Sequence, residues 1–259
     1  MLAITFLGTG TSVGVPVILC DCPTCRSSDP RDQRYRSSIY VEAEDAAWVV
    51  DTGPEFRLQA LRAGLKRVDA VIYTHSHADH VLGFDDLRRF SDANGDFMPV
   101  YAAEETLADL RRMFHYAFSG QARFPGYVHP EPRPITGPFR LGKTEIVPLR
   151  LEHGRAHVLG LLFRQGNRSL AAYLSDCKRV AHPGLKLLAG VDTLILGTPC
   201  FRSHPTHMSL AEGLAFAESL GPRRTWLTHL SHDFLYADVE PELPPNVSLA
   251  YDGLRLELA

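Results

Sequence analysis

Six consecutive residues carry most of the chemistry that this sequence is equipped to do: His75-Ser76-His77-Ala78-Asp79-His80. Imidazole and carboxylate are the ligands that Zn²⁺ and its first-row neighbours accept. In an extended loop, His75 and His77 can face the same way and converge on one ion. Asp79 and His80 can then turn toward a second ion nearby. The spacing therefore predicts a metal centre in preference to a polar loop that is rich in histidine by chance.

The position of this segment supports a metal centre. It directly follows residues 68–74, a short apolar run rich in branched and aromatic side chains, which predicts a buried strand. Three more residues of ligand type follow apolar runs in the same way: His153 after 145–151, Asp176 after 169–175, and His229 after 225–228. Each of the three alone has a plain alternative as a capping or hydrogen-bonded polar group. Together they place ligand-type side chains where several strands leave the core.

The HxHxDH pattern resembles the signature of the metallo-β-lactamase superfamily, and the three later residues occur in the order in which its members supply further ligands. The resemblance implies an α/β fold, the four-layer αββα sandwich, in a single domain spanning residues 1–259. It also implies two metal ions bridged by Asp176. One ion would be held by His75, His77 and His153, and the other by Asp79, His80 and His229.

A second cluster, Cys20-Asp21-Cys22-Pro23-Thr24-Cys25, places three thiols within six residues. Disulfides are not expected, because five cysteines are an odd number and the N-terminus does not resemble a signal peptide. A redox CxxC would open a helix, whereas this segment lies in a proline-containing loop. Three thiolates need a fourth ligand to close a tetrahedral zinc site. His232, three residues past His229, is the expected fourth ligand of a structural zinc.

The combination of CxCxxC, HxHADH and Thr228-His229-Leu230-Ser231-His232 looks like the phosphoribosyl 1,2-cyclic phosphate phosphodiesterase (PhnP-like) family. It is similar, less completely, to a group acting in pyrroloquinoline quinone biosynthesis. The opening residues 6–16 also fit tRNA 3′-processing nucleases. The resemblance spans residue 4 to about residue 253.

The resemblance implies hydrolysis of a small phosphodiester, with a cyclic phosphoribosyl-type ester as the expected substrate. Two divalent ions, Zn or Mn or alternatively Fe, would share a hydroxide that attacks phosphorus. Asp79 and His207 are the expected catalytic residues, with His207 protonating the leaving oxygen. The other histidines, His115, His129, His157, His182 and His204, are expected to be ordinary surface or loop residues.

Two alternatives to a phosphodiesterase remain open. One is a different hydrolase on the same fold, such as a tRNA nuclease, a lactonase or a thioesterase. A dinuclear β-lactamase usually has a cysteine ligand near the position of Asp176, but here Cys177 is next to Asp176 and does not replace it. A tRNA nuclease has a protruding basic arm, and this sequence has no visible insertion that would form one. The other is a non-enzymatic carrier similar to the pyrroloquinoline quinone group. The complete set of seven expected metal ligands argues against a carrier.

Composition fits a cytoplasmic enzyme with a substantial core. The 259 residues are 45% hydrophobic and 22% charged, with a net charge of −3. No apolar run approaches the roughly 20 residues that cross a bilayer, and no basic tract suggests a nucleic-acid partner. The arginines between Arg26 and Arg36 alternate with acids and are expected in a solvated loop. A second copy of the chain, forming a homodimer, is a further partner that the sequence leaves open.

The expected elements alternate between strands and helices. Strands are predicted at 2–7, 38–42, 46–50, 68–74, 144–152, 158–164, 169–175, 191–197 and 224–228, with a closing pair near 247–258 turned by Asp252-Gly253. Helices are predicted at 54–63, 84–90, 104–118 and 210–220. In the third helix, Leu107, Leu110, Met113 and Phe114 are expected in the core. Residues 125–138, which contain five prolines, are expected to form an irregular loop near the cleft.

Overall fold

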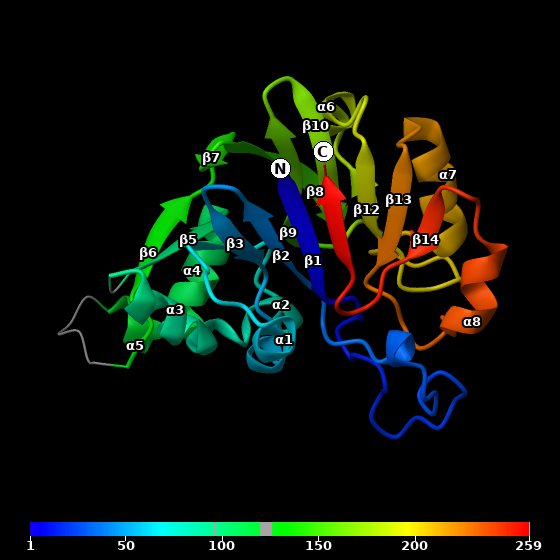
Figure 1. Cartoon of the computed structure of the whole chain (residues 1–259), viewed down its shortest axis with the longest axis horizontal. Helices are drawn as coiled ribbons and strands as arrows, with labels where there is room; N and C mark the ends of the chain where they lie inside the picture. Colours follow the sequence, from blue (N-terminus) through cyan, green and yellow to red (C-terminus); the bar gives the residue numbers. More distant parts are fainter. Residues whose placement is uncertain (96, 120–125, 259) are drawn as a thin grey trace.

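The computed structural model describes residues 1–95, 97–119 and 126–258. Two β-sheets pack face to face (Figure 1). The first contains, in spatial order, β15 (Arg255–Leu258), β1 (Leu2–Gly8), β2 (Ser38–Ala43), β3 (Ala47–Val50), β4 (Ala70–Ile72), β5 (Met98–Ala102) and β6 (Pro130–Pro134). The second contains β11 (Arg179–Val180), β8 (Thr144–His153), β9 (Ala156–Gln165), β10 (Arg168–Leu174), β12 (Thr193–Gly197), β13 (Arg224–Thr228) and β14 (Val247–Leu249), and β7 (Phe139–Leu141) pairs with β8.

Helices cover both outer faces of this sheet pair (Figure 1). The first sheet carries α1 (Phe56–Ala63), α2 (Ala78–Val81), α3 (Arg88–Ala93), α4 (Glu104–Met113) and α5 (His115–Phe118). The second carries α6 (His182–Leu187), α7 (Leu210–Leu220) and α8 (Tyr236–Val239). Short 3₁₀ turns occur at Pro30–Asp32, Phe84–Leu87 and Glu240–Glu242. The four layers confirm the αββα sandwich that the resemblance implied.

The central strands are apolar on both faces because each face is covered. In β3, Trp48 and Val50 face the other sheet, whereas Val49 packs under the helices. The Trp48 ring lies 6.1 Å from that of Phe163 across the sheet interface. Four adjacent residues of β3 are therefore all buried, which explains why this strand reads as an uninterrupted apolar run.

Several neighbouring strands run parallel, so their carboxyl ends meet at one edge. β3 pairs with β4 in parallel, and β12 pairs in parallel with both β10 and β13. The segments that follow these strands lie at the lower edge of the sandwich in Figure 1, where α2 begins. This edge brings together residues that are more than 150 positions apart in the sequence, such as Asp51 and His229.

The predicted helices at 54–63 and 210–220 are confirmed, with local capping as the cause. Gly64 ends α1 in the left-handed conformation at φ 64°. Ser209 and Glu212 form a capping box that begins α7.

Two other helix predictions were partly wrong. The stretch 104–118 is interrupted at Phe114, whose backbone leaves helical geometry while its ring stacks on Phe84 at 4.6 Å. Met113 is 41% exposed and not in the core, whereas Leu107 and Leu110 are buried as expected. The predicted helix at 84–90 is a 3₁₀ turn followed by α3.

One loop prediction and one strand prediction also need correction. Residues 130–134 of the proline-rich stretch, expected in a loop, form β6. Among the described strands β6 pairs with β5 at the end of the sheet, where prolines are tolerated, and no described residue of the stretch lines the cleft that contains the predicted metal ligands. Pro125 itself lies outside the described residues. The closing pair is not a hairpin, because β14 joins β13 and β15 joins β1 in the other sheet. Buried Asp252 holds the crossing point by accepting hydrogen bonds from Thr9 and from the backbone of Tyr35.

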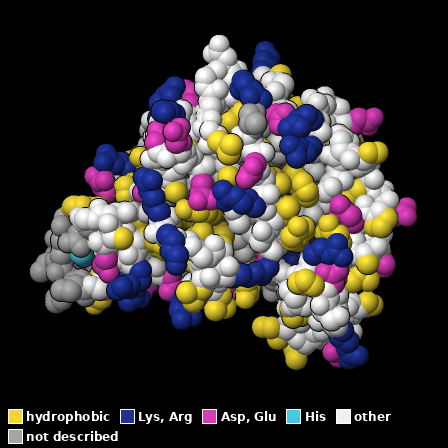
Figure 2. All heavy atoms as spheres, viewed as in Figure 1, with side chains coloured by type: hydrophobic (Ala, Val, Ile, Leu, Met, Phe, Trp, Pro, Cys, Tyr) yellow, Lys and Arg dark blue, Asp and Glu magenta, His cyan; other side chains and the backbone are white. Residues whose placement is uncertain are grey.

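Among the described residues, none of the helices combines the length and apolar character that crossing a membrane requires. On the face shown in Figure 2, Lys and Arg are interspersed with Asp and Glu, and neither sign forms a continuous patch.

Candidate dinuclear metal centre and zinc clip

The first predicted ligand set assembles at the sheet edge. His75 follows β4, His77 precedes α2, and His153 ends β8. One ring nitrogen from each lies within 4.8 Å of the others, a spacing that fits ligands of a single ion. His75 and His153 are buried and His77 is exposed, so this cluster opens to solvent on one side.

The second predicted set gathers around Asp176, which follows β10. Its Oδ2 lies 3.2 Å from His80 Nε2, and its Oδ1 lies 3.4 Å from His229 Nε2 and 3.9 Å from His153 Nε2. His80 Nε2 is also 3.2 Å from Asp79 Oδ2. Asp176 thus touches residues of both sets, which is the position that a bridging carboxylate requires.

Hydrogen bonds on the side away from the cluster fix the orientation of the histidine rings. His80 Nδ1 donates to Asp51 Oδ2 at 2.7 Å, and His153 Nδ1 donates to the carbonyl of Thr206 at 3.0 Å. Ser37 Oγ donates to a backbone carbonyl and therefore accepts from His229 Nδ1, at 3.1 Å. In each case the Nδ1 proton faces the protein and the Nε2 lone pair faces the cluster. Histidine metal ligands are held in this way.

His75 is oriented by a similar chain of hydrogen bonds. Thr74 Oγ1 donates to Asp51 Oδ2 at 2.8 Å, so it accepts from His75 Nδ1 at 3.0 Å. The Thr74 backbone N–H donates to the other oxygen of Asp51. Asp51 therefore supports two ligands, one directly and one through Thr74.

The residues fit a divalent cation on two grounds. His75 Nε2, His80 Nε2 and Asp176 Oδ2 are buried and lack hydrogen-bond partners, although unpaired buried polar atoms are costly. Burial also lowers the pKa of His75, of His153 and of His229, the last to about 4. Neutral imidazole is the form that binds metal.

His80 differs from these three histidines, because its pKa is raised and not lowered. Burial alone would lower its pKa, but the carboxylates of Asp176 and Asp51 outweigh burial and raise the pKa well above its usual value. A positive charge between His80 and Asp176 is therefore favoured, and a metal ion would supply it in place of a proton.

Asp51 is the functional residue that the sequence reading missed. It directly follows the apolar run of β3, just as the predicted ligands follow their strands. This position in the sequence could have identified Asp51 as a candidate. It is fully buried and adopts a positive φ of 61°. It contacts the predicted ligands His75 and His80, the first through Thr74, and is not itself among the predicted ligands.

His207 lies in the same cleft. Its Nε2 is 3.1 Å from Asp176 Oδ1, and its Nδ1 is 3.2 Å from His204 Nδ1. His204, expected to be an ordinary surface residue, is exposed but contacts His207. The geometry brings His207 to the cluster and leaves two roles open to it, since His153, Asp176 and His207 also have metal-ligand spacing.

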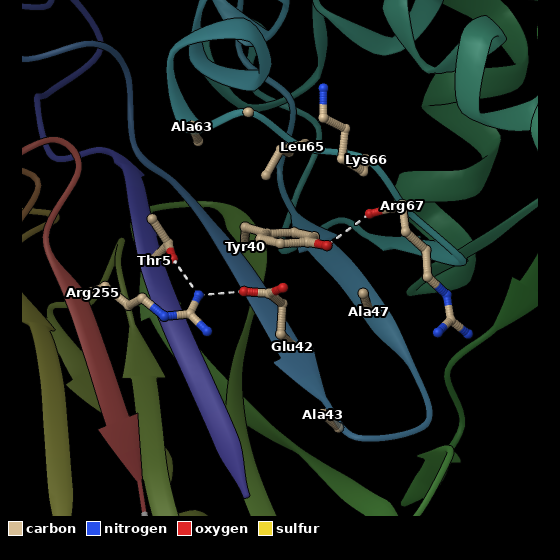
Figure 3. Close-up of a pocket in the computed structure, with 11 residues that line it drawn as sticks. Thr5, Tyr40, Glu42, Ala43, Ala47, Ala63, Leu65, Lys66, Arg67 and Arg255 are labelled. Atoms are coloured by element: carbon tan, nitrogen blue, oxygen red, sulfur yellow. Dashed lines mark hydrogen bonds and ion pairs between the residues drawn. The ribbon is translucent and has the colours of Figure 1, made fainter.

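A cleft of about 370 Å³ opens above this cluster. It is lined by Ser12, His77, Asp79, His153, Gly154, Arg155, Ala156, Asp176, Thr206, His207 and His229. A different cavity lies between α1 and strands β1 to β3 (Figure 3). Its Arg255 pairs with Glu42, and Arg67 pairs with Asp69 at 2.6 Å. This cavity contains none of the predicted metal ligands.

The cysteine cluster meets His232 as predicted from spacing. The Nδ1 atom of His232 lies 3.1, 3.5 and 3.6 Å from the sulfurs of Cys20, Cys22 and Cys25, respectively. The backbone N–H of Cys25 donates to Cys22 Sγ and lowers the pKa of Cys22 to about 7. Three thiolates and one imidazole at these distances fit the four ligands of one tetrahedral zinc ion.

The expectation of solvated arginines between Arg26 and Arg36 holds for Arg26 and Arg31, whose side chains are 68% and 43% exposed, but is wrong for Arg34. Arg34 is 1% exposed, pairs with Asp32 at 3.1 Å, and donates to the carbonyls of Ser231 and Phe234. It therefore fastens the segment around residues 32–34 to the segment that carries His229 and His232.

Comparison with known proteins establishes the family. The beta-lactamase superfamily domain matches residues 48–230. The chain belongs to the metallo-β-lactamase superfamily. A crystal structure of a diphosphatase from the PhnP family has a TM-score of 0.90 at 38% identity, covering 99% of this chain and 98% of that one. Zn²⁺-bound PqqB from Methylobacterium extorquens has a TM-score of 0.80 at 19% identity over 99% of this chain and 100% of that one, which supports the fold alone.

Two of the curated relatives are longer proteins. An octanoyltransferase of Porphyromonas gingivalis is 34% identical over 259 residues, covering 96% of this chain and 50% of the relative. A coenzyme PQQ synthesis protein B of Rhodopseudomonas palustris is 33% identical over 124 residues, covering 43% of this chain and 39% of the relative. The chain thus spans about half, or less, of the length of these relatives.

Proposed function

We propose that the chain is a metal-dependent hydrolase that cleaves a phosphodiester in a small molecule. The observation that carries the proposal is Asp176, buried between two histidine sets whose Nε2 atoms face the floor of an open cleft. His75, His77 and His153 would hold one ion, and Asp79, His80 and His229 the other. Two bound ions would lower the pKa of water and neutralise charge on the phosphoryl oxygens.

The protein's own groups then have distinct tasks. Asp51, Ser37 and the Thr206 carbonyl keep the imidazoles in the productive orientation. His207 stands at the rim of the cluster with its Nε2 directed inward. From there it would protonate the leaving oxygen, a contribution of roughly 10²–10⁴-fold in rate.

A diphosphate anhydride is the second candidate bond. The PhnP-family structure at 38% identity is that of a diphosphatase, and its similarity covers nearly the full chain. Both bonds present a phosphorus with an oxygen leaving group, so the same cluster would serve either. The open cleft and complete ligand set speak against a carrier without activity.

The test is a hydrolysis panel with the chain loaded in turn with Zn²⁺, Mn²⁺ and Fe²⁺. The panel contains bis(p-nitrophenyl) phosphate, a ribosyl cyclic phosphate, 2′,3′- and 3′,5′-cyclic nucleotides, a dinucleoside diphosphate, pre-tRNA and a lactam. We expect metal-dependent turnover of a small phosphodiester or diphosphate that exceeds turnover of the last two. Turnover confined to pre-tRNA or the lactam, or no turnover with any metal, would contradict the proposal.

A further inference from the structure

His77 differs from the other predicted histidine ligands in what holds it in place. Within the described part of the chain, the His77 ring makes no hydrogen bond, whereas each of the four other histidine ligands has a partner on the protein side. His77 is also exposed and lines the catalytic cleft. Water would compete there for any hydrogen bond to the ring, so the position of the ring depends mainly on the backbone at residue 77.

The backbone of His77 is held from both sides along the sequence. On the following side, its carbonyl accepts from the backbone N–H of His80 at 3.0 Å, at the start of α2. On the preceding side, Ser76 Oγ donates to Asp109 Oδ2 at 2.5 Å. Asp109 lies 33 positions beyond Ser76, on α4. A helix that supplies none of the predicted ligands therefore contacts the ligand motif.

Helix α4 is a firm support for this contact. Leu107 and Leu110, which flank Asp109 in the sequence, are buried in the core between the first sheet and its helices. The other carboxylate oxygen of Asp109 pairs with Arg112 on the same helix. Both oxygens therefore have a partner. The hydrogen bond from Ser76 is also charge-assisted, which makes it stronger than a bond between neutral groups.

We infer that Asp109 is a positioning residue for His77, which acts through Ser76 on the backbone of the ligand motif. The inference rests on the metal centre of the proposed function and extends that centre to α4. Without the Asp109 carboxylate, the Ser76 hydroxyl would turn to solvent, and the segment between β4 and α2 would lose its anchor. His77 would then bind its ion less tightly, although every ligand is still present.

The test is a titration of the metal-free centre with Mn²⁺, followed by the electron paramagnetic resonance signal of free Mn²⁺. Thiolates select softer ions such as Zn²⁺, so Mn²⁺ reports on the histidines and carboxylates and not on the cysteines. We expect Asp109→Ala to bind one Mn²⁺ about 3- to 10-fold more weakly than wild type, the effect of one partly exposed hydrogen bond. Asp109→Asn should restore most of the affinity, because the amide oxygen can still accept from Ser76. Wild-type affinity in Asp109→Ala would overturn the inference.

A double-mutant cycle tests whether Asp109 acts through Ser76. Ser76→Ala should weaken Mn²⁺ binding by the same factor as Asp109→Ala, and the double variant should be no weaker than either single variant. Losses that multiply in the double variant would contradict the inference. If Asp109→Ala does not fold, Ser76→Ala removes the same hydrogen bond, and wild-type affinity in that variant is the contradicting result.

Glu104→Gln is the matched control on the same helix. Glu104 pairs with Arg111 at 2.7 Å, as Asp109 pairs with Arg112, but among the described residues it makes no hydrogen bond or ion pair with the ligand motif. Its Mn²⁺ affinity should equal that of wild type. An equal loss in Glu104→Gln and Asp109→Ala would show that the stability of α4 matters and not the contact with Ser76, and would refute the positioning role.

Because metal affinity is measured without turnover, the inference and the proposed reaction can fail separately. A wild-type chain that binds Mn²⁺ at the centre but hydrolyses no compound of the panel would contradict the proposed function, and the affinities would still decide the role of Asp109. Turnover by the wild type, together with unchanged Mn²⁺ affinity in Asp109→Ala, would overturn the role of Asp109 and leave the proposed function intact.

Discussion

At the scale of single residues, the site depends on the backbone conformations of two buried residues and on the hydrogen bonds behind the metal ligands. Three non-glycine residues among those described have positive φ, and two of them, Asp51 at 61° and His229 at 56°, belong to the centre. Such backbone conformations cost free energy and persist where the surroundings enforce them. Here the hydrogen bonds to Thr74 and His80 hold the Asp51 carboxylate in place.

Asp51→Asn should therefore weaken the centre without removing a ligand. Three donors reach the two oxygens of Asp51: the Thr74 N–H at Oδ1, and Thr74 Oγ1 and His80 Nδ1 at Oδ2. An amide has only one acceptor oxygen, so its NH₂ group would face at least one of these donors, and the orientation of His75 and His80 would be weakened. We expect metal affinity or activity to fall by about 10- to 100-fold, as is typical of partners behind metal ligands. Titration of metal into the apo variant measures the effect.

Asp69→Asn is the control for this experiment. Its carboxylate accepts from the Ala47 N–H and pairs with Arg67, at the other end of β4 from His75. Metal affinity should be unchanged in this variant. Wild-type metal affinity in Asp51→Asn would show that ring orientation is set elsewhere.

His207→Ala distinguishes the two roles that its geometry allows. If it protonates the leaving oxygen, turnover of esters with poor alkoxide leaving groups should fall far more than turnover of p-nitrophenyl esters, because nitrophenolate leaves without a proton. Metal content should stay the same. A loss of one metal ion per chain, with equal losses on both ester types, would instead make His207 a ligand, as its 3.1 Å approach to Asp176 allows.

At the scale of elements, two distant loops are joined beside the centre. The cysteines at 20–25 meet His232 at the proposed zinc site, and buried Arg34, further along the chain, donates to the backbone carbonyls of Ser231 and Phe234. Both connections end within a few residues of His229. Closing so long a loop with a metal stabilises the fold, since the free energy of binding becomes free energy of folding.

Cys22→Ser should accordingly cost one zinc ion per chain and lower the melting temperature. Activity should fall as well, because the segment carrying His229 loses its support. Cys200→Ser, which alters a thiol that donates only to the Arg202 carbonyl, should retain all metal and is the control. Unchanged zinc content in Cys22→Ser would refute the clip.

At the scale of the whole molecule, the sequence predicted those features that are encoded locally. The seven proposed ligands could be found because each directly follows an apolar run or lies in one compact motif. The start of helix α7 can be predicted because Ser209 and Glu212 have the spacing of a capping box. These signals require no knowledge of distant parts of the chain.

What the sequence did not predict depends on long-range contacts. The assignment of β14 and β15 to different sheets follows from Asp252, whose buried carboxylate binds Thr9 and Tyr35 more than 200 positions away. The strand character of β6 depends on the open edge of β5, which no local pattern reveals. Likewise, Arg34 is buried only because the segment at 231–234 supplies its acceptors.

The central claim is that the buried histidines and carboxylates hold two metal ions bridged by Asp176. Its most direct test is elemental analysis of wild-type chain and Asp176→Ala, combined with turnover of bis(p-nitrophenyl) phosphate. We predict three ions per wild-type chain, two at the centre and one zinc at the cysteines. In Asp176→Ala, we predict retention of the cysteine zinc, loss of at least one ion from the centre, and turnover lower by orders of magnitude. Near-normal turnover with all three ions still bound to Asp176→Ala would contradict the claim.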